Sequence, residues 1–200
     1  MPSKRKLTVA RLGGNAMEGT SVFENAEHRM AVTESGRAIE VVNATQPAKA
    51  CLPIVDSELD GYHGSILAYG QTSSGKTYTM TGTDALENGE LKGIIPRMVE
   101  NIFARIDETP EDIEFTVNVS MIEIYNEKIR DLLEPGKKNL TIHENKEMGI
   151  YVGDMTETGA RNANEVYGLM RTGNRNRATG STEMNKESSR SHSCFILHIK

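Results

Sequence analysis

Alternation of apolar and polar side chains predicts the main strands of this chain. The longest alternation covers residues 113–125, where every second residue is apolar as far as Met121. The phase then shifts, because Ile122 and Ile124 fall on the other face, and this shift predicts a bulge or a bend. Shorter strands are expected at residues 7–11, 39–42, 66–69 and 193–200, and a hairpin at residues 140–143 and 149–152.

Helical spacing of apolar residues predicts the elements between these strands. In residues 46–62 apolar side chains recur at i, i+3, i+4, i+7 and i+11, and Pro53 is expected to start or kink that helix. A second helix opens with Pro96 in its first turn. A third follows Asn162, which forms a capping-box pattern with Glu165. Two stretches have weaker patterns. Residues 16–42 are expected to form loops with small edge strands, and residues 126–133 a turn with a short helical piece.

The composition is that of an ordinary globular protein. The 200 residues suffice for one domain with a hydrophobic core, and 37% of them are hydrophobic. A net charge of −5 gives no sign of a nucleic-acid binder. The two cysteines lack the spacing of metal ligands and are expected to be reduced thiols in the cytosol. No apolar run approaches the ~18 residues of a membrane span, and the basic start lacks the apolar stretch of a secretory signal.

The stretch GSILAYGQTSSGKTYTM carries the most specific chemistry of the chain. An apolar strand runs into residues 70–77, which fit G-x-x-x-x-G-K-[ST], the loop that wraps the phosphates of a nucleotide. Gly70 and Gly75 let the backbone turn tightly and approach the phosphates. The loop amides and the following helix direct partial positive charge at an anion. Lys76 adds a full charge toward the β- and γ-phosphates, and the hydroxyl of Thr77 suits Mg²⁺.

A second polar constellation, residues 185–192, lies directly before the last expected strand. Its sequence NKESSRSH brings hydroxyls, a guanidinium and an imidazole into eight residues. By spacing alone, this segment fits a polar loop with a helix cap as well as it fits a reactive site.

Several segments together resemble the kinesin motor domain. GYHGSILAYGQTSSGKTYTM, GIIPRMVENIF, VSMIEIYNEKIRDLL and NKESSRSHS occur in this order. The resemblance covers residues 46–200, and the part around residues 114–147 is most similar to a conventional kinesin heavy chain.

The resemblance implies an ATPase that engages microtubules, with ATP and Mg²⁺ as cofactors. It assigns the nucleotide to Gly70, Gln71, Thr72, Ser73, Ser74, Gly75, Lys76, Thr77 and Tyr78, with the ring of Tyr78 against adenine. It assigns the first switch segment, which senses the γ-phosphate during hydrolysis, to Asn185, Ser188, Ser189, Arg190 and His192. It makes Thr77 and Ser189 the ligands of Mg²⁺, and it pairs Arg190 with a glutamate of the second switch.

Strands and helices alternating around a phosphate loop predict an α/β fold of the P-loop NTPase type. We expect a three-layer sandwich with a central, mostly parallel or mixed sheet flanked by helices, incomplete at its C-terminal side. The phosphates would lie at the carboxyl ends of the strands. Residues 1–45 are interpreted as a divergent segment with degraded first strands, since Arg11 is all that remains of the Arg-x-Arg-Pro pattern that borders adenine in kinesins. Residues 46–200 are interpreted as the N-terminal portion of the motor domain, ending before the second switch.

Three functions are weighed on these grounds. The first is a microtubule motor ATPase of the cytoplasm and its microtubule cytoskeleton, with no nucleic acid, no membrane insertion and an oligomeric state not encoded in this segment. The second is a non-motile remnant that binds nucleotide or microtubules. The third is an unrelated P-loop kinase or GTPase, which is disfavoured because residues 185–188 read Asn-Lys-Glu-Ser and not Asn-Lys-x-Asp.

Overall fold

The computed structural model describes most of the chain from residue 54 onward and four short strands before it. The described residues are 5–11, 21–24, 28–32, 38–42, 54–57, 59–60, 62–70, 74–82, 92–110, 112–146, 149–179 and 191–200.

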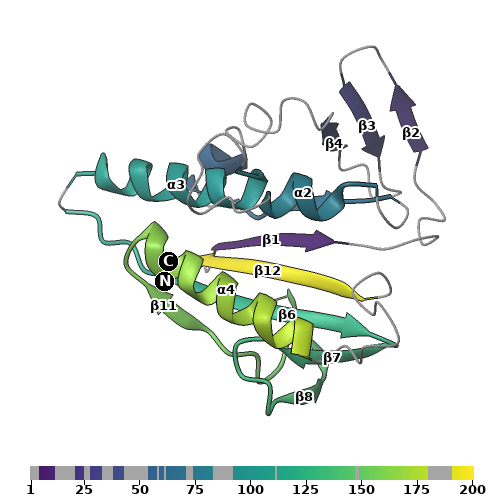
Figure 1. Ribbon diagram of the computed structural model, residues 1–200. Helices are drawn as coiled ribbons and strands as arrows, with labels where there is room; N and C mark the ends of the chain where they lie inside the picture. Colours follow the sequence, from purple (N-terminus) through teal and green to yellow (C-terminus); the bar gives the residue numbers. More distant parts are fainter. Residues whose placement is uncertain are drawn as a thin grey trace.

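A curled seven-stranded sheet forms the centre of the molecule (Figure 1). Its order is β5 (Gly64–Ala68), β1 (Arg5–Arg11), β12 (His192–Ile199), β6 (Val117–Tyr125), β7 (Lys128–Asp131) and β8 (Lys138–Leu140), and β11 (Thr158–Ala160) also pairs with β6. Among the strands that the structure describes in this sheet, β1 and β5 pair in parallel and the other pairs are antiparallel. The sheet is therefore mixed as expected, but the prediction that it is mostly parallel is wrong. Short turns join β6 to β7 and β7 to β8, and such connections permit only antiparallel neighbours.

Two smaller antiparallel sheets complete the strands. β2 (Ser21–Glu24), β3 (His28–Val32) and β4 (Ala38–Val42) form one of them, in the region expected to hold small edge strands. β9 (Ile142–Asn145) and β10 (Gly149–Val152) form the other, which confirms the predicted hairpin.

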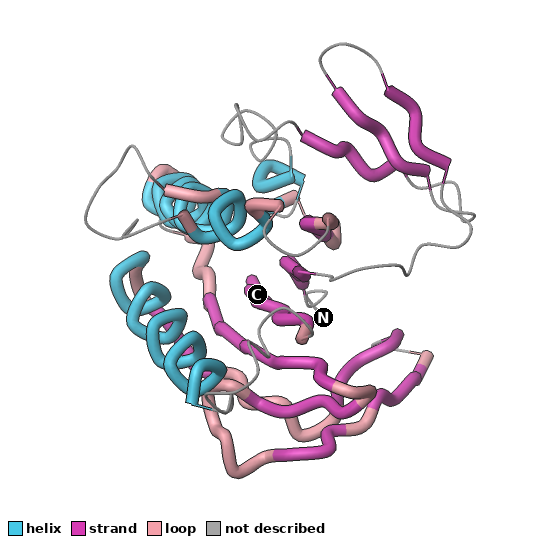
Figure 2. Tube along the Cα trace, turned by 45° about the vertical axis from the view of Figure 1, so that its right-hand side comes forward, coloured by secondary structure: helices cyan, strands magenta, loops and turns pink. Residues whose placement is uncertain are grey.

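The described helices pack against one face of the central sheet. They are α2 (Lys76–Thr81), α3 (Ile94–Asp107) and α4 (Ala163–Thr179), with residues 54–57 and 59 also helical. Figure 2 shows α3 and α4 gathered on the same side of the strands. Alternate residues of β6 and β12 meet these helices in one core, which includes Val119, Met121, Phe195, Leu197, Val99, Ile102 and Val166. A second helical layer, as a three-layer sandwich requires, stays a prediction.

Two sequence expectations hold in detail. Pro96 lies in the first turn of α3, where Val99 and Ile102 are fully buried. Asn162 caps α4, because its Oδ1 accepts a hydrogen bond from the backbone amide of Glu165 over 3.0 Å. The carboxylate of Glu165 in turn accepts one from the amide of residue 161. Pro53 lies outside the described residues.

The strand predicted at residues 113–125 is wrong at its start and in its expected bulge. β6 begins only at Val117, and Ile113 is 52% exposed. The pairing of β6 with β12 is unbroken over residues 117–124. The shift of phase at Ile122 has another cause: this face of β6 is also covered, and Ile122 packs there with Ile129 and Cys194.

The short helix predicted within residues 126–133 is also wrong. Asn126 and Glu127 have φ values of 50° and 61°, and this pair of left-handed residues turns the chain back into a hairpin. β7 then pairs with β6, with Ile129 opposite Ile124. Cross-strand packing overrides the local preference for a helix here.

Candidate nucleotide-binding site

The phosphate loop leaves the sheet at the carboxyl end of β5. Tyr69 and Gly70 follow the strand, and Ser74 and Gly75 lead directly into α2. The strand–loop–helix order expected for this motif is thus present.

Both loop glycines have backbone angles that other residues rarely adopt. The φ of Gly70 is 151° and that of Gly75 is 87°. A Cβ on Gly70 would also lie 2.4 Å from Oγ of Ser74, so that this hydroxyl would have to rotate away. The loop path therefore depends on glycine at position 70 chiefly for its conformation.

Lys76 bridges the loop. Lys76 is the first residue of α2 and is 7% exposed. Its Nζ donates a hydrogen bond to the carbonyl of Gly70. Thr77 and Tyr78 follow with exposed side chains, and half of the Tyr78 surface is open to solvent. An ammonium, a hydroxyl and an aromatic ring thus follow one another in the first turn of α2.

The first residues of β12 lie at the same end of the strands as the last residues of β5. Arg11 on β1 pairs in parallel with Ala68 and antiparallel with Ser193. Two neighbouring strand spacings, about 10 Å, therefore separate Ala68 from Ser193. His192, the described end of the predicted switch segment, therefore begins β12 at the end of the sheet where β5 leads into Tyr69 and Gly70.

The other predicted site residues lie outside the described residues: Gln71, Thr72, Ser73, Asn185, Ser188, Ser189 and Arg190. Their assignment stays a prediction. Within the described part of the chain, no three His, Cys, Asp or Glu side chains gather in an arrangement that could hold a metal ion. None of the described helices is both long and apolar enough to cross a membrane.

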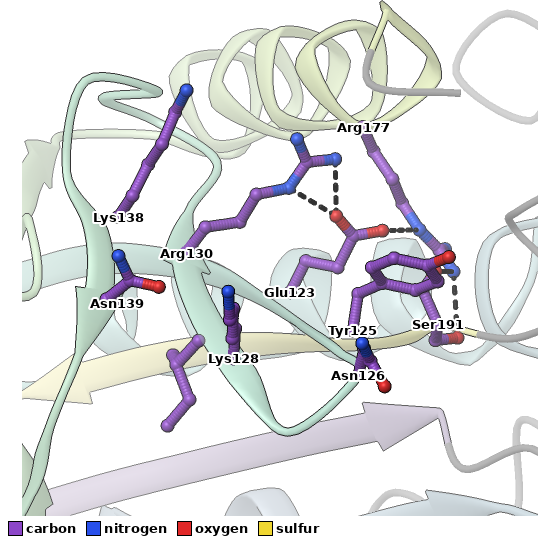
Figure 3. A pocket seen from close by; sticks show the side chains of 10 residues that line it. Glu123, Tyr125, Asn126, Lys128, Arg130, Lys138, Asn139, Arg177 and Ser191 are labelled. Atoms are coloured by element: carbon purple, nitrogen blue, oxygen red, sulfur yellow. Dashed lines mark hydrogen bonds and ion pairs between the residues drawn. The ribbon is translucent and has the colours of Figure 1, made fainter. Parts of the chain in front are cut away.

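Sequence reasoning missed a charged cluster next to Ser191. Glu123, a buried residue of β6, forms ion pairs with Arg130 of β7 and Arg177 of α4. The guanidinium of Arg177 also donates hydrogen bonds to Ser191, and a cavity of about 280 Å³ lies beside the cluster (Figure 3). One feature of the sequence could have indicated this cluster: Glu123 is a single carboxylate in the middle of the apolar strand sequence MIEIY.

Comparisons with known proteins agree on one family. The kinesin motor domain model matches residues 24–200. A kinesin heavy chain of Botryotinia fuckeliana is 52% identical over 147 residues, which cover 74% of this chain and 17% of that protein. One of Caenorhabditis elegans is 50% identical over 151 residues, covering 76% and 18%. This chain thus spans less than a fifth of the length of these relatives.

A solved structure supports the same assignment. It is described as the structure of a fast kinesin, with implications for ATPase mechanism and interactions with microtubules. The TM-score is 0.75 at 38% sequence identity, over 98% of this chain and 59% of the solved one. This chain belongs to the kinesin motor domain family.

Proposed function

We propose that this chain is the nucleotide-binding part of a microtubule motor that hydrolyses ATP in the cytoplasm. One observation carries the proposal. The end of β5, where the phosphate loop begins, and the start of β12 lie at the same end of the strands, and β1 separates the two strands. A loop that holds phosphates and a segment that senses the terminal one have to be neighbours, and the strand order β5, β1, β12 supports that arrangement.

Side chains at this end of the strands fit Mg²⁺ and ATP. Mg²⁺ keeps most of its waters and takes one or two protein oxygens besides the phosphates, so it needs no cage of carboxylates. The exposed hydroxyl of Thr77 is one such oxygen, and Ser189 would be the second. When bound, Mg²⁺ neutralises charge on the β- and γ-phosphates.

The side chains of this chain divide the remaining tasks. Lys76 neutralises the phosphates, and the exposed ring of Tyr78 is available to stack against adenine. Asn185, Ser188, Ser189 and Arg190 supply the hydroxyls and the guanidinium that hold the terminal phosphate and the attacking water. Positioning and charge stabilisation of this kind are the main contributions of a protein to phosphoryl transfer.

The hairpin of β9 and β10 is the proposed contact with the microtubule within this segment. All four residues of β9 are exposed, and Ile142 and Ile150 are exposed by 63% and 68%. Because Ile142 pairs with Val152, Ile150 lies two residues along on the same face of the hairpin. Two large apolar side chains open to solvent on one face of the hairpin suit contact with a partner surface.

Binding of a fluorescent ATP analogue in the presence of Mg²⁺ tests the nucleotide site. We expect weak binding by the 200-residue chain and none by Lys76→Ala. Lys138→Ala, which removes an exposed ammonium from β8, is the matched control and should bind as the unchanged chain does. Equal affinity of the Lys76→Ala variant would remove Lys76 from the phosphate site.

Co-sedimentation with microtubules tests the motor assignment. A motor segment is released from microtubules by ATP, whereas a protein that only adheres to them is not. We therefore expect ATP to shift this chain into the supernatant, and Lys76→Ala to abolish the shift without abolishing adherence.

A further inference from the structure

Gly93, directly before α3, leaves no room for a side chain against the end of α2. It is buried and precedes Ile94, the first residue of α3. A Cβ on Gly93 would lie 2.6 Å from the carbonyl carbon of Met80, and 2.7 Å from both the oxygen of that carbonyl and the amide nitrogen of Gly82. All three atoms belong to the backbone, so rotation of a side chain cannot relieve the overlap.

The backbone conformation of Gly93 does not itself require glycine. Its φ of −76° and ψ of −167° are those of an extended residue, which side chains of every kind permit. Glycine is needed here only because two stretches of backbone approach closely. This approach is where α2 meets α3 (Figure 1), and Gly82 and Lys92 form a β-bridge beside it.

The helix α2 is held less firmly than α3. It buries two of its six residues, Lys76 and Met80, whereas α3 buries six of its 14. Lys92, on the other side of Gly93, is also tied to α3, because its ammonium forms an ion pair with Glu100. A methyl group added at position 93 would therefore displace α2 and leave α3 in place.

A displacement of α2 reaches the phosphate loop directly. The helix is less than two turns long, and its last backbone hydrogen bond runs from the amide of Gly82 to the carbonyl of Tyr78 over 2.8 Å. Lys76 lies one turn before Met80, and its Nζ donates a hydrogen bond to the carbonyl of Gly70 in the loop. A helix this short moves as a unit, so a shift at Met80 also moves Lys76.

We infer that Gly93 is a positioning residue for the nucleotide: it lets the start of α3 touch the backbone of Met80, and this contact sets where α2 presents Lys76 and Thr77 to the phosphates. The inference rests on the proposed function and deepens it, because it extends the phosphate site to a residue outside the phosphate loop. Gly93 acts through α2 and needs no contact with the nucleotide.

Binding of a fluorescent ATP analogue with Mg²⁺ by the 200-residue chain tests the inference. Gly93→Ala adds one methyl group at the contact and should raise the dissociation constant about tenfold, because Lys76 and Thr77 are then misplaced by a fraction of an ångström. Urea unfolding of the same variant gives its folded fraction. When more than about nine-tenths of the chains are folded, unfolding alone cannot weaken the apparent affinity tenfold.

Ile102→Val is the matched control. Ile102 is fully buried in α3, more than two turns beyond Gly93, and its truncation adds no atom at the contact with α2. The variant should lower the urea midpoint through lost packing, and its dissociation constant should stay within about twofold of the wild-type value.

Three results would overturn the inference and leave the proposed function in place. The first is an unchanged dissociation constant in Gly93→Ala. The second is an equal rise in Ile102→Val, because any weakening of α3 would then act as the added methyl group does. The third is a Gly93→Ala chain without a cooperative unfolding transition, which would show that the contact supports the whole core. A wild-type chain that does not bind the analogue removes the proposed function itself, and the inference with it.

Discussion

The hydroxyl of Tyr167 on α4 donates a hydrogen bond to Oε1 of Glu100 on α3 over 2.8 Å. The same hydroxyl lies 3.1 Å from the carbonyl oxygen of Pro96, and the tyrosine is 5% exposed. Burial raises the pKa of Tyr167 well above its usual value, and the neighbouring carboxylate of Glu100 raises that pKa further. The neutral phenol thus connects the two long helices inside the core.

Tyr167→Phe should lower the free energy of unfolding by about 1 kcal/mol at neutral pH, since one buried hydrogen bond is lost. The raised pKa means that ionisation is easier in the unfolded chain. The contribution of Tyr167 is therefore complete below about pH 10 and is lost as the pH rises beyond it. Urea unfolding at pH 7.5 and 10.5 checks this. Ionisation of the other tyrosines affects both proteins equally and cancels when their free energies of unfolding are subtracted. A difference between wild type and Tyr167→Phe that does not shrink at pH 10.5 would contradict the prediction.

Gly70→Ala should remove nucleotide binding and lower the free energy of unfolding by about 1–3 kcal/mol, because the Cβ meets Ser74 and the φ is unfavourable. Gly136→Ala is the control, since nothing lies within 4 Å of its Cβ position. Nucleotide binding and the free energy of unfolding should both stay near the wild-type values in Gly136→Ala. Retained binding of a fluorescent ATP analogue by Gly70→Ala would show that the loop tolerates a side chain at its first position.

Asp131 holds the turn after β7 from a fully buried position. Its Oδ1 accepts hydrogen bonds from the amides of Leu133 and Glu134 over 2.8 and 2.9 Å, and its Oδ2 accepts one from the amide of Thr156 over 2.7 Å. Asp131→Ala leaves these donors unpaired and should cost about 3 kcal/mol in urea unfolding.

Asp131→Asn separates shape from hydrogen bonding at the same position. The amide can replace Oδ1, but its NH₂ group faces the amide of Thr156, so a loss of about 1–2 kcal/mol is expected. Asp112→Asn changes an exposed carboxylate and should leave the unfolding midpoint unchanged. If Asp131→Ala and Asp112→Asn unfold at the same urea concentration, the buried carboxylate does not organise this turn.

Replacing Ile142 and Ile150 together by serine should weaken co-sedimentation with microtubules about tenfold, because two exposed apolar side chains are removed from one face. Both are largely open to solvent, so the melting temperature should change little. Ile113→Ser is the control, since Ile113 is also more than half exposed but lies outside the hairpin. If that variant weakens binding as much, hydrophobicity in general and not the hairpin accounts for adherence.

Local patterns were sufficient wherever neighbours in sequence decide the structure. The cap at Asn162, the first turn of α3 and the glycines of the phosphate loop all follow from short-range geometry. β12 was also predicted, because both of its faces are buried and its middle, residues 194–197, is a continuous apolar run.

Long-range pairing decided the points that the sequence left open. The segment after Glu127 has a helical pattern, yet it becomes a strand because β6 offers it a partner. The charges of Arg130 and Arg177 are ordinary in the sequence, and only the fold brings them to one carboxylate. The direction of the strands was misjudged because a phosphate loop suggests parallel neighbours, whereas β12 returns antiparallel between β1 and β6.

The central place of β12 has a consequence for biosynthesis. β1 and β5 pair with each other, as do β6, β7 and β8, and among the described strands β12 alone pairs with both groups. We therefore expect the two groups to remain separate, partly exposed sheets during translation until residues 192–199 have left the ribosome. Pairing across so many residues is slow, so this interval is when chaperones have the greatest opportunity to act.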